Sequence, residues 1–180
     1  MALTATVYKL DIDLSDADRQ VYESLSLQAA RHPSESEAYF VTRVLAYALE
    51  YTPGIEFSRG GLSAPDDPAI AVRDLTGAIR SWIEVGMPDA ARLHKAAKAS
   101  PRVAAYMHKD PGQLMNQLAG ERIQRADAIE MYAIDRALIA QLAERLDRRM
   151  AFALSVSDRE LYLSIGTENL TGAVVRHALP

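Results

Sequence analysis

The chain has 180 residues, of which 49% are hydrophobic and 24% are charged, a balance typical of a folded protein rather than a disordered one. Lysine and arginine number 20 against 24 aspartates and glutamates, a net charge of -4 that argues against a broad grip on duplex DNA. The lack of cysteine excludes disulfides, thiolate metal sites and cysteine nucleophiles. We expect one compact domain, residues 1–180, that is cytoplasmic and does not span a membrane.

The first fifty residues predict one strand and two helices. Residues 4–14 alternate between apolar and polar, as in a half-buried strand. Ser15 and the acids after it are typical of a helix start, and the apolar residues that follow are spaced as on a helix that ends before Pro33. The S-x-x-E spacing of 34–37 predicts a capping box for a second helix with an apolar stripe over 40–49.

Strands and helices then follow with short turns. The predicted strands are 55–58, 78–85, 102–107, 128–133, 150–156, 160–165 and 172–177, and the predicted helices are 89–100, 111–125 and 135–149. This order is not the strict alternation of a doubly wound parallel sheet. We therefore predict an α/β (α+β) fold in which helices flank a mixed β-sheet.

Glu84 is the anomaly of this pattern. It lies at the end of the apolar strand 79–85, although glutamate is a poor strand former. A buried carboxylate is costly unless it is paired, protonated or bound to a metal. The simpler interpretation is an ion pair with Arg80 on a solvated face, and the functional one is a metal site.

Other carboxylates could join Glu84. Asp66 follows Pro65, and Asp74 lies near the start of the same strand, although a Pro-Asp pair is also typical of an ordinary turn. Glu37 is accounted for by the capping box, whereas Glu35 is not needed for it and is the better candidate for a site. An acid in the first helical turn nevertheless also has a structural reason, because it stabilises the helix.

A basic segment follows Glu84. Residues 91–109 hold five cations and no acid. The cations are Arg92, Lys95, Lys98, Arg102 and Lys109. Such a run is usually a solvated helix face, and the functional interpretation is a cationic surface beside the carboxylates.

Carboxylates beside cations favour phosphate chemistry. Two carboxylates can hold Mg²⁺ with several waters, the metal can activate a water, and a nearby lysine can orient that water or stabilise the transition state. The chain has no P-loop and no H-E-x-x-H pair. Without cysteine, oxygen ligands must build any metal site, which narrows the metal to Mg²⁺ or Mn²⁺.

Several short motifs resemble a known family. They are the opening MALTATVYK, RHPSE at 31–35, FSRG at 57–60, DDP at 66–68, WIEVGMPD at 82–89 and RLHKA at 92–96. In this order, over essentially the whole chain, they resemble the YaeQ family of bacterial proteins. The resemblance implies a compact α/β fold around a variation of the PD-(D/E)XK nuclease motif, with a restriction-endonuclease-like core.

The resemblance also implies roles for single residues. Glu84 would be the second acid of the motif, Asp66 (or, as the competing choice, Asp74) the first, and Glu35 a third metal ligand. Gly86 stands where the motif has its lysine, and Lys95 is the natural substitute.

We therefore expect a Mg²⁺- or Mn²⁺-dependent phosphodiester hydrolase acting on nucleic acid. Its catalytic residues would be Asp66, Glu84 and Lys95, and its metal ligands Glu35, Asp66 and Glu84. The sequence does not determine the oligomeric state, and a monomer is the favoured one. The alternative is a non-catalytic binding or regulatory protein that retains a degenerate nuclease-like site, because the lysine is displaced and the chain is acidic.

Overall fold

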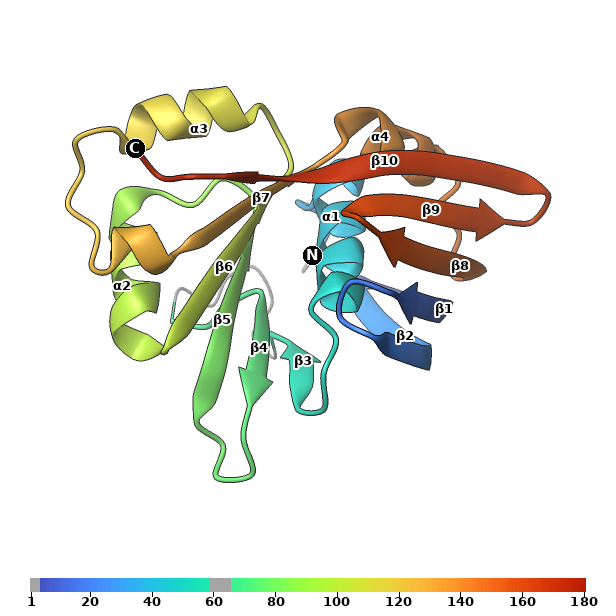
Figure 1. Cartoon of the computed structure of the whole chain (residues 1–180). Helices are drawn as coiled ribbons and strands as arrows, with labels where there is room; N and C mark the ends of the chain where they lie inside the picture. The colour runs from blue at the N-terminus through green and yellow to red at the C-terminus, as the bar shows by residue number, and fades with distance from the viewer. Residues whose placement is uncertain (1–3, 59–65) are drawn as a thin grey trace. The chain divides into compact units, whose positions relative to one another are not determined.

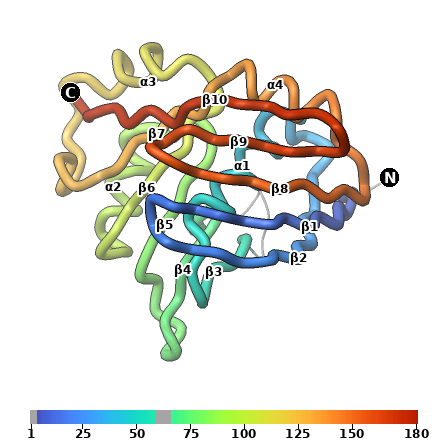
Figure 2. The backbone as a smooth tube through the Cα atoms, turned by 45° about the vertical axis from the view of Figure 1, so that its right-hand side comes forward, coloured from blue at the N-terminus to red at the C-terminus, as the bar shows by residue number. Residues whose placement is uncertain are grey.

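The computed structural model describes residues 4–58 and 66–180. The chain folds into two compact units, the first made of Met1–Val44 and Ile134–Val175 and the second of Leu45–Ala133 and Arg176–Pro180. Figures 1 and 2 show the course of the chain through both units. That residues 1–180 form one domain stays a prediction.

Within the described residues, five strands form the sheet of the first unit. They are β1 (Thr6–Asp16), β2 (Val21–Arg31), β8 (Arg149–Ser157), β9 (Glu160–Ile165) and most of β10 (Glu168–His177). They lie in the order β2-β1-β8-β9-β10. The β1–β8 pair is parallel, and the β1–β2, β8–β9 and β9–β10 pairs are antiparallel. Strands from the two ends of the sequence therefore lie side by side, as Figure 2 shows for blue β1 and orange β8.

The helix predicted after Ser15 is wrong. This segment is β2, which pairs with β1 along its full length after a turn in which Gln20 has a positive φ of 57°. Leu25, Leu27 and Ala29 are buried while their neighbours are exposed. Leu25 and Ala29 are four residues apart, a spacing that puts two side chains on one face of a helix or of a strand. Pairing with β1 decides for the strand.

The predicted second helix is confirmed as α1 (Glu37–Leu49). Its start differs from the expected capping box, because Ser36 Oγ accepts a hydrogen bond from the Tyr39 N–H. Ser36 is therefore the capping side chain, and Ser34 instead contacts His32 Nδ1 at 2.6 Å. The chain passes from the first unit into the second within α1, between Val44 and Leu45.

The second unit holds a mixed sheet. Its strands are β3 (Ile55–Phe57), β4 (Ile70–Arg73), β5 (Ile79–Val85), β6 (Arg102–Met107) and β7 (Glu130–Ile134), in the order β7-β6-β5-β4-β3. The β5–β6 and β6–β7 pairs are parallel, and the β3–β4 and β4–β5 pairs are antiparallel. β4 was not predicted, since four residues are too few for a clear alternation of apolar and polar side chains.

Helices cover these sheets, which confirms the predicted α/β class with a mixed sheet. The helices after α1 are α2 (Ala90–Ala99), α3 (Pro111–Leu118), shorter than predicted, and α4 (Arg136–Glu144). In the second unit, α2 buries Leu93, Ala96 and Ala97 against Trp82 of β5 and neighbouring apolar residues, as Figure 1 shows for α2 beside β5 and β6. Within residues 4–58 and 66–180, no helix has both the length and the apolar character to cross a bilayer.

Candidate functional site

Glu84 is buried, with 5% of its surface exposed. It lies on the face of β5 that α2 covers, together with Trp82 two residues earlier. Its Oε1 accepts hydrogen bonds from Trp82 Nε1 at 2.5 Å and from Arg92 Nε at 3.0 Å. The expected ion pair with Arg80 is wrong, because the Arg80 guanidinium faces Asp74 at 3.8 Å. Glu84 is therefore buried rather than on a solvated face, which contradicts the simpler of the two interpretations.

The environment of Glu84 acts on its pKa in two opposite directions. Burial raises the pKa of this carboxyl above its ordinary value, and the hydrogen bonds and charge of Trp82 and Arg92 oppose the rise without cancelling it. The Arg92 guanidinium also lies 5.6 Å from the centre of the Trp82 ring, a cation–π distance. The three side chains therefore form one packed polar cluster.

Lys95 forms an ion pair with Asp66, its Nζ donating to Asp66 Oδ1. The Asp66 side chain is 83% exposed. This hydrogen bond and the charge of Lys95 lower the pKa of Asp66 below its ordinary value. Pro65, the other residue of the Pro-Asp pair, lies outside the described residues.

A single helical turn gathers these groups. Arg92 and Lys95 are three residues apart on α2 and therefore share a face. Arg92 also donates through an Nη atom to the Asp67 carbonyl at 2.6 Å, which fastens the chain next to Asp66 to the helix. Asp89 caps this turn by accepting from the Arg92 N–H at 2.8 Å. Asp66, Glu84 and Lys95 are thus all linked to the first two turns of α2.

Asp74, the competing first acid, has a turn role. Its Oδ1 accepts from the Thr76 and Ala78 N–H groups at 2.9 and 3.1 Å, between β4 and β5. The strand advances by about 17 Å between Ile79 and Glu84, so Asp74 lies at the opposite end of β5 from Glu84. Of the two alternatives, Asp66 is the one whose partner Lys95 lies on the helix that also holds Glu84, and its role as the first acid stays a prediction.

Glu35 belongs to the first unit and is buried, with 5% of its surface exposed. Its carboxylate accepts from Arg43 Nε at 3.3 Å and from the His32 N–H at 3.0 Å. Glu35 lies before the first turn of α1 rather than in it, and its carboxylate ties this segment to Arg43. Its role as a third metal ligand stays a prediction.

The carboxylates of Asp66 and Glu84 are ligands of the type that Mg²⁺ or Mn²⁺ takes. No group of three histidine, aspartate or glutamate side chains that could hold a metal occurs in the described part of the chain. Magnesium, however, is often bound by one or two carboxylates with water completing the shell. Asp66 and Glu84 supply two such carboxylates, each already paired with a cation.

The predicted cationic surface of 91–109 is largely neutralised. Arg92 pairs with Glu84, Lys95 with Asp66, and Arg102 with both Glu50 and Glu130. For Lys98 and Lys109, no ion pair is found within residues 4–58 and 66–180. The acids come from other elements, which explains why a segment without acids looked unbalanced in the sequence.

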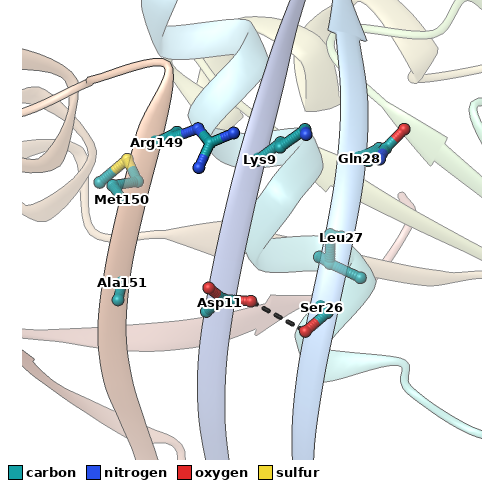
Figure 3. Close-up of a pocket in the computed structure, with 8 residues that line it drawn as sticks. All are labelled: Lys9, Asp11, Ser26, Leu27, Gln28, Arg149, Met150 and Ala151. Carbon is teal, nitrogen blue, oxygen red and sulfur yellow. Dashed lines mark hydrogen bonds between the residues drawn. The ribbon is translucent and has the colours of Figure 1, made fainter.

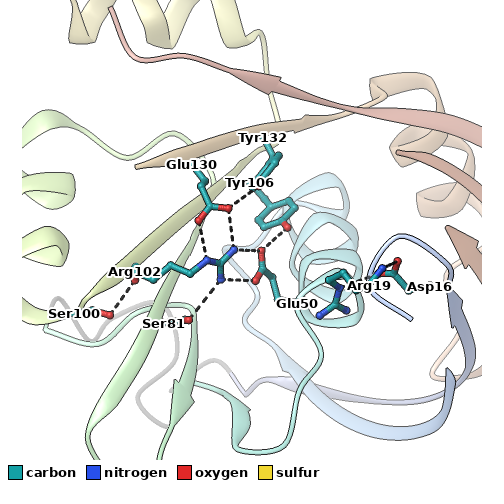
Figure 4. A network of polar contacts seen from close by, with 9 residues as sticks. All are labelled: Asp16, Arg19, Glu50, Ser81, Ser100, Arg102, Tyr106, Glu130 and Tyr132. Atoms are coloured by element: carbon teal, nitrogen blue, oxygen red, sulfur yellow. Dashed lines mark hydrogen bonds and ion pairs between the residues drawn. The ribbon is translucent and has the colours of Figure 1, made fainter. Parts of the chain in front are cut away.

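A second polar cluster, which was not predicted from the sequence, is centred on Arg102 (Figure 4). Arg102 Nη1 lies 2.7 Å from Glu50 Oε2, and its Nε lies 2.8 Å from Glu130 Oε2. Tyr106 and Tyr132 donate their hydroxyl hydrogens to Glu50 and Glu130, each at 2.7 Å. On β6, Arg102 and Tyr106 alternate with the residues that pair with Trp82 and Glu84 of β5. Successive side chains of a strand point to opposite faces, so the Arg102 cluster lies on the face of the sheet opposite Glu84.

Mutual pairing stabilises the charges in this second cluster. Burial alone would lower the pKa of Arg102, but hydrogen bonds to Glu50 and Glu130 raise it above its ordinary value. Burial raises the pKa of Tyr106 well above its ordinary value and that of Tyr132 to about 12. The only signal in the sequence was Glu50, an acid directly after the apolar end of α1, whose partner lies 52 residues away.

Comparisons with known proteins all lead to one family. The family described as YaeQ protein matches residues 1–174. The chain is 33% identical to "Uncharacterized protein YaeQ" of Salmonella typhi and 31% identical to that of Escherichia coli K12, in both cases over 94% of each chain. The crystal structure of YaeQ from Xanthomonas axonopodis pv. citri superposes with a TM-score of 0.88 at 30% identity, covering 98% of this chain and 100% of that one. The structure from Pseudomonas syringae gives 0.84 at 28%, covering 96% and 95%.

Proposed function

Since the chain belongs to the YaeQ family, we propose that it carries a variant of the PD-(D/E)XK nuclease site and hydrolyses phosphodiester bonds of nucleic acid with Mg²⁺ or Mn²⁺. One observation supports the proposal above all: Lys95 of α2 contacts Asp66, and Arg92 of the same helix contacts Glu84. Two acids and a lysine, distant in sequence, are thereby linked to one helix. This is the residue set that such a reaction needs.

Each residue of this set would have its own role in the reaction. Asp66 and Glu84 would hold the metal, which neutralises a phosphodiester oxygen and lowers the pKa of a bound water. Trp82 and Arg92 fix the orientation of the Glu84 carboxylate. Lys95 would leave Asp66 for a phosphate oxygen or the attacking water, where its charge stabilises the transition state. Its side chain is 46% exposed, so it can make this exchange without unpacking the core.

The test is cleavage of supercoiled plasmid and single-stranded DNA with Mg²⁺ or Mn²⁺. We expect Glu84→Gln and Lys95→Met each to lower the rate by about a hundredfold or more, the usual effect of losing one electrostatic catalytic group. Lys98→Met is the matched control, because Lys98 lies one turn further along α2, and it should cleave at the parent rate. Activity that survives Glu84→Gln would contradict the assignment.

One observation favours the alternative, a non-catalytic protein with a degenerate site. Each carboxylate is already neutralised by a cation of the same chain, Asp66 by Lys95 and Glu84 by Arg92. A calorimetric titration with Mn²⁺ separates the two functions. The hydrolase requires saturable binding that Asp66→Asn weakens, whereas neither binding nor cleavage is expected of the degenerate site.

A further inference from the structure

Three side chains of the first unit form a row across neighbouring strands. Lys9 of β1 is the register partner of Arg149 on β8 and of Gln28 on β2. All three residues are exposed, on the face opposite the buried Leu10 and Leu27. They line a cavity of about 390 Å³ together with Asp11 and Ser26 (Figure 3). This volume lies within the range of small-molecule sites.

The row brings two positive charges together and itself contains no acid, since its third member is Gln28. Within residues 4–58 and 66–180, neither the Lys9 ammonium nor the Arg149 guanidinium is found in an ion pair or a side-chain hydrogen bond. Like charges at directly paired positions of a sheet repel each other and lower its stability. An anion between them would remove this repulsion, and the guanidinium fork matches the oxygens of a phosphate.

The adjacent row limits what the anion can be. Asp11 lies two residues along β1, about 7 Å away, and accepts a hydrogen bond from Ser26 Oγ at 2.8 Å. Asp13 repeats the arrangement with Ser24 at 3.0 Å. A nucleic-acid strand running along β1 would place further phosphates over these acids. A hydroxyl group of a compact ligand could instead donate to Asp11.

We propose that the cavity lined by Lys9, Arg149 and Asp11, here called the groove, binds a sugar carrying one phosphate. The phosphate would lie on Lys9 and Arg149, and a sugar hydroxyl on Asp11. The sugar phosphate can be free or part of a nucleoside monophosphate, because both present the same groups. The proposal does not rest on the proposed hydrolase. The residues of the proposed hydrolase, Asp66, Glu84 and Lys95, belong to the second unit. Variants of the groove therefore test the sugar-phosphate site separately from the hydrolase.

The test is calorimetric titration of the full chain with ribose 5-phosphate and with AMP, with a thermal scan of the free protein. We expect Arg149→Gln and Lys9→Gln each to weaken binding by about tenfold or more, the scale of one lost hydrogen bond to a charged group. Both variants should melt above the parent when ligand-free, because the repulsion is gone, which shows that weaker binding is not misfolding. Lys98→Gln removes a cation of the second unit instead, and this control variant should bind both ligands as the parent does.

Asp11→Asn tests the sugar contact. It should weaken binding of ribose 5-phosphate and leave binding of inorganic phosphate unchanged or stronger, since a negative charge near the anion is lost. Binding of AMP but not of ribose 5-phosphate would identify the nucleotide as the source. Absence of saturable binding, equal affinities in the parent and Arg149→Gln, or tighter binding of an oligonucleotide at these same residues would each overturn the proposal.

Discussion

At the scale of single residues, Arg92 is the residue on which the candidate site depends. It contacts Glu84, Trp82 and the Asp67 carbonyl, and it is only 25% exposed. Removing one partner of a buried ion pair leaves an uncompensated charge, at a cost of several kcal/mol when burial is complete. Because Arg92 is partly exposed, a smaller effect is expected.

We expect Arg92→Met to lower the free energy of unfolding by about 2 kcal/mol at neutral pH, measured by urea denaturation. Glu84→Gln in the same chain should recover most of that loss, since no charge then remains buried. Additive losses in the double variant would mean that Arg92 and Glu84 are not energetically coupled.

Tyr132 gives a prediction about alkaline pH. Its pKa is raised to about 12, first by burial and then by its hydrogen bond to Glu130. The stabilisation is fully present below about pH 10, where the unfolded chain also keeps the phenol proton. It is lost between about pH 10 and pH 12, as the unfolded chain ionises before the folded one.

The corresponding loss is about 1 kcal/mol, after allowing for the partly exposed side chain. Unfolding free energies of the parent and Tyr132→Phe, compared at about pH 8 and about pH 11, measure it. The parent should lose more stability than the variant over this interval. Equal losses would show that the phenol titrates alike in the folded and unfolded chains.

At the scale of elements, α4 packs so closely on β10 that the contact requires glycine at position 172. A Cβ atom added to Gly172 would lie 2.8 Å from Asp135 Cβ and 2.9 Å from Leu138 Cβ. Neither of these atoms can move without moving the start of α4. The requirement is steric, because the φ of Gly172 is not in the left-handed region.

Gly172→Ala should therefore cost about 2 kcal/mol of unfolding free energy, the usual penalty of overpacking. Gly112→Ala is the matched control. An added Cβ there meets only Asp110 Oδ1, at 3.4 Å, and alanine in α3 should be neutral or stabilising by about 0.5 kcal/mol. Equal effects in the two variants, measured by thermal unfolding, would contradict the steric argument.

At the scale of the whole molecule, the two units share elements. The chain crosses the boundary between them within α1, after Ala133 and near the end of β10. Unfolding of either unit therefore disrupts an element of the other. We expect one cooperative transition rather than two.

The single tryptophan makes this measurable. Trp82 is buried in the second unit, so its fluorescence follows that unit, whereas far-UV circular dichroism follows both. The two denaturation curves should coincide, also in Ile12→Ala, which weakens the first unit by about 3 kcal/mol. A fluorescence transition that stays at the parent midpoint in Ile12→Ala would show that the units unfold independently.

Local patterns were sufficient for most elements of the fold and for part of the candidate site. Apolar periodicity and caps identified α1, α2 and α4 and the strands β1, β5 and β6, and strand propensity alone marked Glu84 as unusual. The same reasoning was wrong for β2, where a four-residue spacing fits a helix and a strand equally well. It also missed β4, which is too short for any period to be visible.

By itself, the sequence determined the α/β class, the unusual position of Glu84 in an apolar strand and the lack of thiolate chemistry. These follow from local propensity, alternation and composition, which need no knowledge of distant contacts. Only the tertiary structure decided the partners: Arg92 rather than Arg80 for Glu84, Lys95 for Asp66, and Glu50 and Glu130 for Arg102. These pairs join residues 8 to 52 positions apart. Ion pairing depends on distance in space, and strand order and helix packing set that distance.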